Sequence, residues 1–343
     1  MEDIKTYYIS TVWDKKMNDN YFSRLFHCYK NSKVLVTGGA GFVGSNLVRK
    51  LLEFEADVTV LDDLFSGSEV NLKGMDDISF IRGDVRDKKL VDEIITSFDY
   101  VFHLAARNII VSTQNPKEDF EVNIGGTLNL LLSLKKSKTI KKFIYTSSVS
   151  IYGNPKYLPI NEDDTINLLS PYAVSKLGGE NYTTVFFENF NLPTAIVRYS
   201  NVYGDFQTVT NPYCGVIGKF IECAISGKPV IIHGDGEQTR DFTYVEDAVD
   251  ATLLAGVSER STGEIFNIGT GIETSVNRLI SLLELICKKQ ITIKHIDKRD
   301  IDNIRRRVVN IEKIRKKLRW QPLFSLKDGL DNTVKWFGNN MKL

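Results

Sequence analysis

The sequence has few features of a metal site, a disulfide scaffold, a membrane span or a nucleic-acid partner. Its four cysteines, at positions 28, 214, 223 and 287, are widely separated, so we expect reduced thiols and no bound metal. It has no apolar run long enough to cross a bilayer and no recognisable signal peptide. With 44 basic and 43 acidic side chains, its net charge of +1 provides no general attraction to nucleic acid or to an anionic membrane. We therefore expect a cytoplasmic protein without nucleic-acid or membrane partners.

A predicted strand, a glycine-rich turn and a predicted helix follow one another in the sequence K-V-L-V-T-G-G-A-G-F-V-G of residues 33–44. This arrangement places a diphosphate at the N-terminus of a helix. We expect Gly38 to permit the tight turn, Gly41 to leave room for phosphate, and Gly44 to let the helix pack closely on the strand. The alternative is a turn that is rich in glycine and binds no ligand.

Two acids at the end of the second predicted strand favour a dinucleotide as that ligand. Asp62 lies about twenty residues beyond the glycine turn, where a carboxylate can accept hydrogen bonds from an adenosine ribose and repel a 2′-phosphate. Asp63 adds a second negative charge, so the sequence predicts NAD rather than NADP as the cofactor. The alternative is that Asp62 is a solvated turn residue.

Short apolar strands and helices alternate between residues 33 and 198. Such alternation is typical of a Rossmann-type, doubly wound parallel sheet with helices on both faces and ligands at the carboxyl ends of its strands. We predict strands at residues 34–36, 58–61, 79–82, 100–104, 142–146 and 194–198, and helices at residues 44–53, 88–97, 122–135 and 172–190. We assign residues 1–31 to an N-terminal extension with a short helix near 20–29, residues 32–204 with return segments near 235–270 to the NAD-binding domain, and residues 205–343 to a smaller α/β substrate lobe.

Two further segments are predicted to border the cofactor. Asp84 follows the third strand and can accept a hydrogen bond from an adenine amine while Val85 packs on the ring. An equal alternative is that Asp84 caps the helix that follows. The small-residue segment Leu104, Ala105 and Ala106 ends the fourth strand and can let the cofactor lie against the backbone, or can serve tight packing of a helix on the strand.

The chemistry is predicted at the end of the fifth strand and in the helix that follows it. Tyr172 and Lys176 are one helical turn apart and share a face. A lysine cation favours a phenolate, and we expect it to lower the pKa of Tyr172 and make it a general base, with Ser148 bound to the same substrate hydroxyl. The alternative is a buried aromatic residue beside a surface charge.

Together these motifs resemble the extended short-chain dehydrogenases/reductases, and among them the nucleotide-sugar epimerases of the UDP-glucose 4-epimerase type. The resemblance extends from about residue 33 to residue 331. Its motifs are T-G-G-A-G-F-V-G at 37–44, L-D-D-L at 61–64, G-D-V-R-D at 83–87, H-L-A-A at 103–106, N-x-x-G-T at 123–127, T-S-S-V-S-I-Y-G at 146–153, Y-A-V-S-K at 172–176, R-Y-S-N-V-Y-G at 198–204 and G-E-Q-T-R-D-F-T-Y-V-E-D at 236–247.

The resemblance implies that Ser148, Tyr172 and Lys176 form a catalytic triad beside a tightly held NAD. In such enzymes the tyrosine takes the proton of the sugar 4-hydroxyl while hydride passes to NAD, and the 4-keto sugar then turns and takes the hydride back on its other face. The implied substrate is a UDP-sugar: UDP-glucose or UDP-galactose, a UDP-N-acetylhexosamine, or UDP-glucuronate. Further cofactor contacts are expected at Phe42, Val43, Asn123 and Tyr199, and for Asn123 we prefer structural support to direct chemistry.

Val149 and Ser150 stand where the dehydratases of this group have an Asp-Glu pair and the UDP-glucuronate decarboxylases have a glutamate. Neither residue can transfer a proton as a carboxylic acid does, which favours epimerisation over dehydration and, less strongly, over decarboxylation. A decarboxylase, an epimerase acting at another carbon, and an inactive dinucleotide-binding sensor remain the alternatives. The triad is an argument against the sensor, because a binding protein needs no activated phenol.

The substrate nucleotide is expected to contact the smaller lobe. The resemblance implies a diphosphate contact at Asn201, and the start of a helix near Val216 and Lys219 is expected to help hold the nucleotide. Arg240 has a guanidinium suited to a diphosphate, with a surface salt bridge to its neighbour Asp241 as the alternative. The resemblance also places Arg299 at the nucleotide, although the proline and glycine of that motif are missing here. It further implies a homodimer formed by the helices at 122–135 and 172–190.

Overall fold

The structure is a computed structural model that describes residues 23–207, 215–298 and 303–340, and the statements below concern these residues. Seven parallel strands form its central sheet in the order β11-β6-β5-β4-β1-β2-β3. These strands are β1 (Lys33–Thr37), β2 (Asp57–Asp62), β3 (Ile78–Arg82), β4 (Tyr100–His103), β5 (Lys142–Ser148), β6 (Thr194–Tyr199) and β11 (Glu264–Ile268). The first six confirm the predicted strands to within two residues, and β11 comes from the segment near 235–270.

Both faces of this sheet are apolar. In β1, the side chain of Leu35 belongs to the hydrophobic core on one face, whereas Val34 and Val36 belong to the core on the other face. The same alternation occurs in β5 at Phe143 and Ile144. Because both faces are buried, the central strands are continuous apolar runs, and this made them predictable from sequence.

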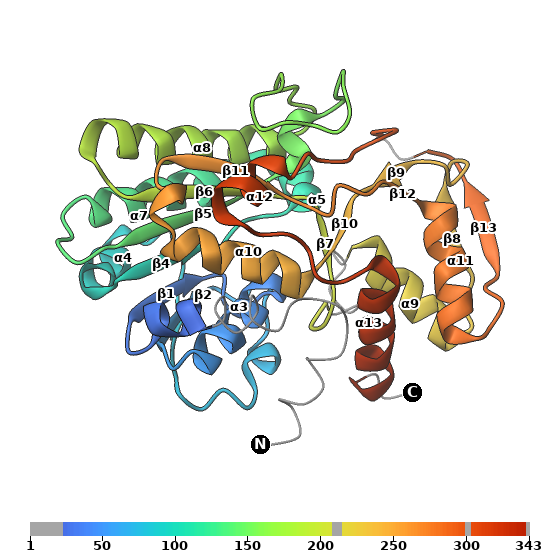
Figure 1. Ribbon diagram of the computed structural model, residues 1–343, viewed down its shortest axis with the longest axis horizontal. Coiled ribbons are helices and arrows are strands. Elements are labelled where there is room, and N and C mark those ends of the chain that lie inside the picture. The colour runs from blue at the N-terminus through green and yellow to red at the C-terminus, as the bar shows by residue number, and fades with distance from the viewer. Residues whose placement is uncertain (1–22, 208–214, 299–302, 341–343) are drawn as a thin grey trace.

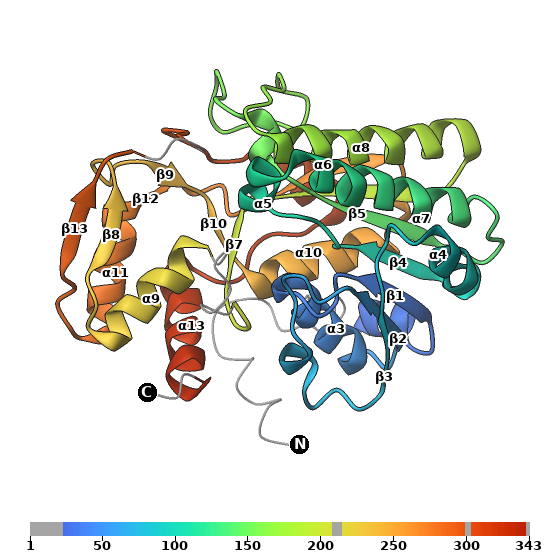
Figure 2. The ribbon, with the colours of Figure 1, turned by 180° about the vertical axis from the view of Figure 1, so that it is seen from behind.

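Helices cover the sheet as two layers (Figure 1 and Figure 2). Those of the larger lobe are α3 (Phe42–Glu53), α4 (Lys88–Ile94), α5 (Ile109–Gln114), α6 (Pro116–Asp119), α7 (Thr127–Leu134), α8 (Pro171–Phe190) and α10 (Val245–Val257). α3 packs against α10 on one face, and α7 packs against α4 and α8 on the other. The helix predicted at 122–135 is interrupted, because a π-helical segment, η3 (Phe120–Gly126), precedes α7. We did not predict α5 or α6.

A smaller lobe is built from the second half of the chain and lies beside the carboxyl ends of the strands (Figure 1). Its longer elements are α9 (Val216–Ser226), β8 (Val230–His233), α11 (Val276–Cys287), β13 (Ile293–Ile296) and α13 (Leu326–Asn340). Short elements from along the whole chain complete the described structure: η1 (Glu69–Leu72), η2 (Ile95–Ser97), η4 (Val149–Tyr152), β7 (Asn201–Tyr203), β9 (Thr239–Arg240), β10 (Phe242–Tyr244), η5 (Glu259–Ser261), β12 (Thr274–Ser275) and α12 (Glu312–Leu318). The domain boundary at residue 204 stays a prediction.

Residues 23–29 form a helix that is packed against the larger lobe. The hydroxyl of Tyr29 donates a hydrogen bond to the carbonyl of Leu253 in α10 (2.7 Å), and its ring meets that of Tyr100 edge-on at 5.0 Å between centroids. This helix therefore covers part of the larger lobe. In the part of the chain that the structure describes, no helix combines the length and apolarity of a membrane span, and no cluster of metal-ligating side chains is found.

Candidate active site

The glycine turn between β1 and α3 leaves no space for side chains. Gly38 has φ +72°, and a Cβ atom at this position would lie 2.6 Å from the backbone nitrogen of Ala105. A Cβ atom on Gly44 would lie 2.1 Å from the carbonyl oxygen of Gly38. These contacts confirm the tight turn at Gly38 and the close helix packing at Gly44. α3 begins at Phe42, two residues earlier than predicted, and Gly41 is its N-cap.

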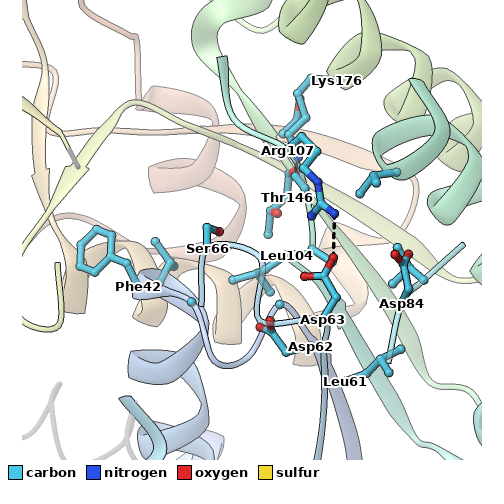
Figure 3. Close-up of a pocket in the computed structure, with 18 of the residues that line it drawn as sticks. Phe42, Leu61, Asp62, Asp63, Ser66, Asp84, Leu104, Arg107, Thr146 and Lys176 are labelled. Carbon is cyan, nitrogen blue, oxygen red and sulfur yellow. Dashed lines mark hydrogen bonds and ion pairs between the residues drawn. The ribbon is translucent and has the colours of Figure 1, made fainter. Parts of the chain in front are cut away.

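A cavity of about 260 Å³ lies at the carboxyl ends of the strands, above this turn (Figure 3). Of the residues predicted to contact the cofactor, all except Gly44 and Asn123 line it: Gly38, Gly41, Phe42, Val43, Asp62, Asp63, Asp84, Val85, Leu104, Ala105, Ala106, Tyr172, Lys176 and Tyr199. It is also lined by residues that we did not predict: Leu61, Ser66, Gly83, Arg107, Val122, Thr146 and Ser147. An elongated pocket that begins at a helix N-terminus and ends at Tyr172 suits a dinucleotide.

The two acids after β2 have different partners. The carboxylate of Asp62 accepts hydrogen bonds from the backbone nitrogens of Ala40 (2.9 Å) and Leu64 (2.8 Å), so it is fixed against the glycine turn. Burial raises the pKa of Asp62, and these hydrogen bonds oppose the change. Asp63 instead forms an ion pair with Arg107 (2.7 Å). Arg107 therefore balances the second negative charge that Asp63 adds, a pairing that the sequence did not reveal.

Asp84 and Asn123 are both bound to other parts of the protein. The carboxylate of Asp84 accepts from the guanidinium (2.9 Å) and from the backbone nitrogen (2.8 Å) of Arg86, and the residue that caps α4 is Asp87. The capping alternative for Asp84 is thus wrong, and its contact with adenine stays a prediction. Asn123 accepts from the backbone nitrogen of Arg107 (2.7 Å) and donates to its carbonyl (3.0 Å). This is the structural support that we preferred.

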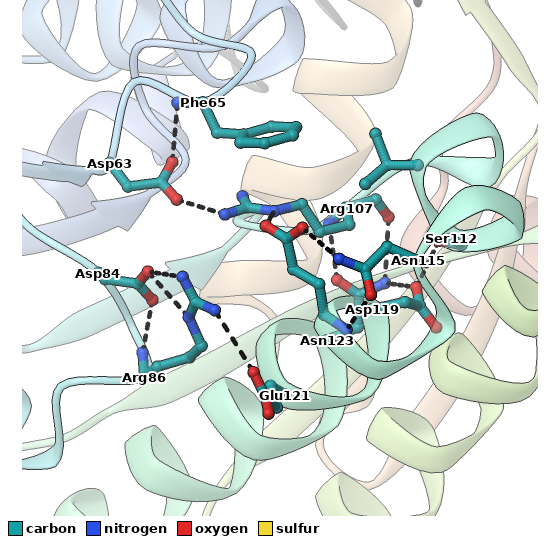
Figure 4. A network of polar contacts seen from close by, with 12 residues as sticks. Asp63, Phe65, Asp84, Arg86, Arg107, Ser112, Asn115, Asp119, Glu121 and Asn123 are labelled. Atoms are coloured by element: carbon teal, nitrogen blue, oxygen red, sulfur yellow. Dashed lines mark hydrogen bonds and ion pairs between the residues drawn. The ribbon is translucent and has the colours of Figure 1, made fainter.

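Arg107 is the main residue of this site that the sequence did not reveal. Its side chain is 5% exposed, and its guanidinium joins Asp63 (2.7 Å), in the loop after β2, to Glu118 (2.8 Å) in α6. The ring of Phe65 covers it, with 3.8 Å between the guanidinium carbon and the ring centroid (Figure 4). These partners come from two other segments of the chain, so no local sequence pattern indicates them. Arg107 therefore connects the loop after β2 to α6.

Replacing Arg107 by alanine should weaken NAD binding by about tenfold or more, which corresponds to roughly 1.4 kcal/mol. The change leaves Asp63 and Glu118 without their shared cation and frees the loop that carries Asp62. Titration calorimetry with NAD measures the effect. Arg86→Ala is the matched control, because that guanidinium is 37% exposed and we expect its loss to be much milder. Equal losses for the two variants would contradict the role given to Arg107.

The structure brings Ser148 to Tyr172, which lines the inner end of the pocket together with Lys176. Ser148 ends β5, while Tyr172 and Lys176 lie in α8, whose first turn is capped by the Ser170 hydroxyl. The phenol of Tyr172 is hydrogen-bonded to the side chain of Ser148. The Lys176 ammonium donates to the carbonyl of Thr146 (2.8 Å) and lies 5.9 Å from the centroid of the Tyr172 ring. These are the relations that a phenol base, its hydroxyl partner and a nearby cation require.

Burial dominates the electrostatics of this group. It raises the pKa of Tyr172 to about 12, against the hydrogen bond from Ser148, and lowers the pKa of Lys176 to about 8. The prediction that Lys176 brings the pKa of Tyr172 below its ordinary value is therefore wrong for the protein alone, because removing the phenolate from water costs more than the nearby cation returns. A positive charge in the pocket would favour the phenolate.

Of the predicted substrate residues, Tyr172 lines the pocket described above, whereas Asn201, Val216, Lys219 and Arg240 do not. Asn201 begins β7, Val216 and Lys219 are in the first turn of α9, and Arg240 ends β9. Arg240 donates to the carbonyls of Thr239 and Ile304, both at 2.8 Å. The buried carboxylate of its neighbour Asp241 accepts from the backbone nitrogens of Thr270 (2.8 Å) and Gly271 (3.0 Å). The substrate roles stay predictions, and Arg299 falls outside the described residues.

This fold and this site define an NAD-binding enzyme of the extended short-chain dehydrogenase/reductase class. The chain belongs to the NAD dependent epimerase/dehydratase family, whose model matches residues 34–269. It is 40% identical over 312 residues to a putative UDP-glucose 4-epimerase of Methanocaldococcus jannaschii, covering 90% of this chain and 99% of that protein. The UDP-glucose 4-epimerase of Thermotoga maritima, solved with UDP-glucose, has a TM-score of 0.83 and 39% identity, covering 90% of this chain and 99% of that chain.

Relatives with another activity are also similar. A UDP-N-acetyl-alpha-D-glucosaminuronate decarboxylase of Bacillus cytotoxicus is 34% identical over 318 residues, covering 89% of this chain and 98% of that protein. The predictions of the Rossmann-type fold, of a nucleotide-sugar epimerase and of NAD as its cofactor are confirmed. Membership of the family therefore does not by itself decide which of these reactions the protein catalyses.

Proposed function

We propose that this protein interconverts the C4 epimers of a UDP-hexose, with NAD as its cofactor. The observation that supports this most directly is that Tyr172, hydrogen-bonded to Ser148, and Lys176 line the end of a pocket that begins at the glycine turn. The solved UDP-glucose 4-epimerase that contains UDP-glucose shares the fold over nearly the whole chain. The glycine turn suits NAD, because Gly38 and Gly41 line the pocket at the start of α3 and a side chain at Gly38 would collide with the backbone of Ala105.

In this proposal each side chain of the triad has its own task. NAD, when bound, supplies the acceptor and donor of hydride for the sugar carbon. Tyr172 takes the proton of the 4-hydroxyl as a phenolate, and Ser148 donates to or accepts from the same hydroxyl. Lys176 stabilises the phenolate without accepting the proton itself. Inversion requires that the oxidised sugar present its other face before Tyr172 returns the proton.

Dehydration and decarboxylation are the alternative reactions to epimerisation on this fold. Dehydration requires a second acid–base pair, and the positions next to Ser148 are Val149, which is buried, and Ser150, whose buried hydroxyl has no hydrogen-bond partner among the described residues. Decarboxylation of a uronic acid is the second candidate, because a decarboxylase is among the relatives. The triad disfavours an inactive sensor.

The purified, NAD-loaded protein should be incubated separately with UDP-glucose, UDP-N-acetylglucosamine and UDP-glucuronate, and the products resolved by proton NMR. We expect the C4 epimer of at least one of these sugars to accumulate to an equilibrium mixture, with no net formation of NADH. Release of CO₂ and a UDP-pentose would establish the decarboxylase instead. Full NAD loading without conversion of any sugar would favour the sensor.

We further propose a homodimer that forms through α7 and α8 and resides in the cytoplasm. Support for the dimer comes from exposed apolar side chains on α8, where Val174, Tyr182 and Val185 are spaced to share one side of the helix, and from Leu132 on α7. The cysteines that the structure describes are free thiols, which suits a reducing compartment. The mass of the protein in solution, measured by light scattering, tests the proposed dimer, and the mass of a monomer would contradict it.

A further inference from the structure

The buried ammonium of Lys176 donates, among the residues that the structure describes, a single hydrogen bond, to the carbonyl of Thr146. Among the described residues, the charged or titratable groups that face it are the carboxylates of Asp119 and Glu180, the phenols of Tyr145 and Tyr172, and the imidazole of His103. Burial keeps His103 neutral by lowering its pKa to about 3, and both of its ring nitrogens bond threonine hydroxyls. The stabilising charge must therefore come from a carboxylate.

Glu180 is already compensated by another cation. Both of its carboxylate oxygens accept from Arg198 of β6, at 2.9 and 2.7 Å, and both side chains are nearly inaccessible to water. A carboxylate in a bidentate pair with a guanidinium presents little net charge to a third group. Glu180 thus contributes less to Lys176 than its position in the same helix suggests.

Asp119 has no such cation. It is 2% exposed, and its carboxylate accepts from three neutral groups: the Ser112 hydroxyl, the Ser175 hydroxyl (2.9 Å) and the Asn123 amide (2.7 Å). Figure 4 shows this carboxylate beside Ser112 and Asn123, at the end of the network that begins at Arg107. All three bonds end on the same oxygen, Oδ1. No cation forms an ion pair with Asp119 among the described residues, and its partner Ser175 is the residue directly before Lys176, whose pKa the carboxylate raises.

We propose that the buried carboxylate of Asp119 is the counter-charge of the Lys176 ammonium, acting across space, and that it sets the pH range in which Tyr172 and Lys176 work as a pair. This inference rests on the proposed function, in which these two side chains handle the substrate proton. Asp119 is a positioning residue: its bond to Ser175 also fixes the residue next to Lys176 in α8. No direct ion pair joins the two side chains among the described residues.

The sign of the effect follows from Coulomb's law. A negative charge stabilises the ammonium and destabilises the phenolate, so Asp119 raises the pKa of Lys176 and also that of Tyr172. Removing the charge lowers both, and the pair titrates as a unit. The rate profile requires a deprotonated Tyr172 at its acid limb and a protonated Lys176 at its alkaline limb. Both limbs should therefore move to lower pH.

Asp119→Asn is a suitable test because the amide oxygen can keep the three hydrogen bonds made at Oδ1 while the charge is lost. We expect the kcat profile of epimerisation, measured between about pH 6 and pH 10, to shift to lower pH by about one unit on both limbs. Asp119→Glu should return the profile towards its original position. Asp119→Ser is a second neutral variant in case the amide is not accommodated.

Two controls separate charge from structure. Glu121→Gln removes the same charge from the same segment, but Glu121 pairs with Arg86 near the surface, and we expect no shift. Ser175→Ala removes a hydrogen bond of Asp119 and leaves its charge, so melting temperature should fall without a shift in the profile. A lower rate at unchanged limb positions in Asp119→Asn would overturn the proposal.

A readout without turnover distinguishes failure of this proposal from failure of the proposed function. The ultraviolet absorption of the Tyr172 phenolate is obtained by subtracting the titration of NAD-loaded Tyr172→Phe from that of the NAD-loaded parent protein. Asp119→Asn should move this titration to lower pH even if no UDP-sugar is converted. An unmoved phenolate titration would refute the counter-charge, whatever the reaction proves to be.

Discussion

Replacing Tyr172 by phenylalanine should slow epimerisation by about 10³- to 10⁴-fold, the upper range of what a positioned acid–base group contributes. The ring and its packing in α8 are retained, and only the hydroxyl that bonds Ser148 is removed. Without it, the protein loses the group to which the proposed mechanism assigns the 4-hydroxyl proton. NMR rates at saturating substrate measure kcat, and absorbance of the purified protein measures bound NAD.

The variant should still bind NAD, because the glycine turn and Asp62 hold the opposite end of the pocket. Tyr157→Phe is the matched control: the same hydroxyl is removed from a side chain that is 74% exposed, and full activity is expected. Full activity of Tyr172→Phe would mean that another group is the base. Loss of bound NAD would mean that the hydroxyl serves the cofactor rather than the proton transfer.

Replacing Arg198 by methionine should destabilise the protein by about 3–5 kcal/mol, because it leaves a buried carboxylate without its cation. Arg198 binds Glu180 of α8 through two bonds and also donates to the hydroxyl of Tyr152 (2.6 Å) and the carbonyl of Glu162 (2.7 Å). It therefore joins the catalytic helix to β6 and to the segment after β5. The midpoint of urea unfolding, followed by circular dichroism at fixed NAD concentration, measures the change.

The double variant Arg198→Met/Glu180→Leu should recover much of this loss, since replacing a buried pair by apolar side chains is often neutral. Arg306→Met is the surface control: that guanidinium pairs with Glu273 but is 60% exposed, so we expect an unchanged midpoint. If Arg198→Met unfolded at the same urea concentration as the parent, the pair would not be a main connection between α8 and the sheet.

The parts of the site that follow from short-range sequence were predicted well. Gly38 and Gly44 are required by local backbone geometry, a left-handed turn and a helix packed at contact distance, which glycine alone permits. Tyr172 and Lys176 share a face because helical spacing places them one turn apart. The parallel strands were recognisable because both of their faces are buried.

Predictions that depended on the surroundings of a side chain were less accurate. The cation that balances Asp63 was not foreseen, because Arg107 lies 44 positions later in the chain. The single helix expected at 122–135 is preceded by α5, α6 and a π-helical segment, and this irregular stretch provides Glu118, Asp119 and Asn123. Such a stretch has no regular apolar period from which it could be predicted.

The sequence by itself determined the family and the order of the strands along the chain, and it predicted the cofactor turn and the triad, because each is recognised from short motifs of neighbouring residues. Only the tertiary structure decided the charges around that triad. It pairs Glu180 with Arg198, leaves Asp119 among neutral donors, and buries Tyr172 so that its pKa rises. The physical reason is that the strength of a charge depends on its distance from other charges and from water, and both are set by segments that meet only when the chain is folded.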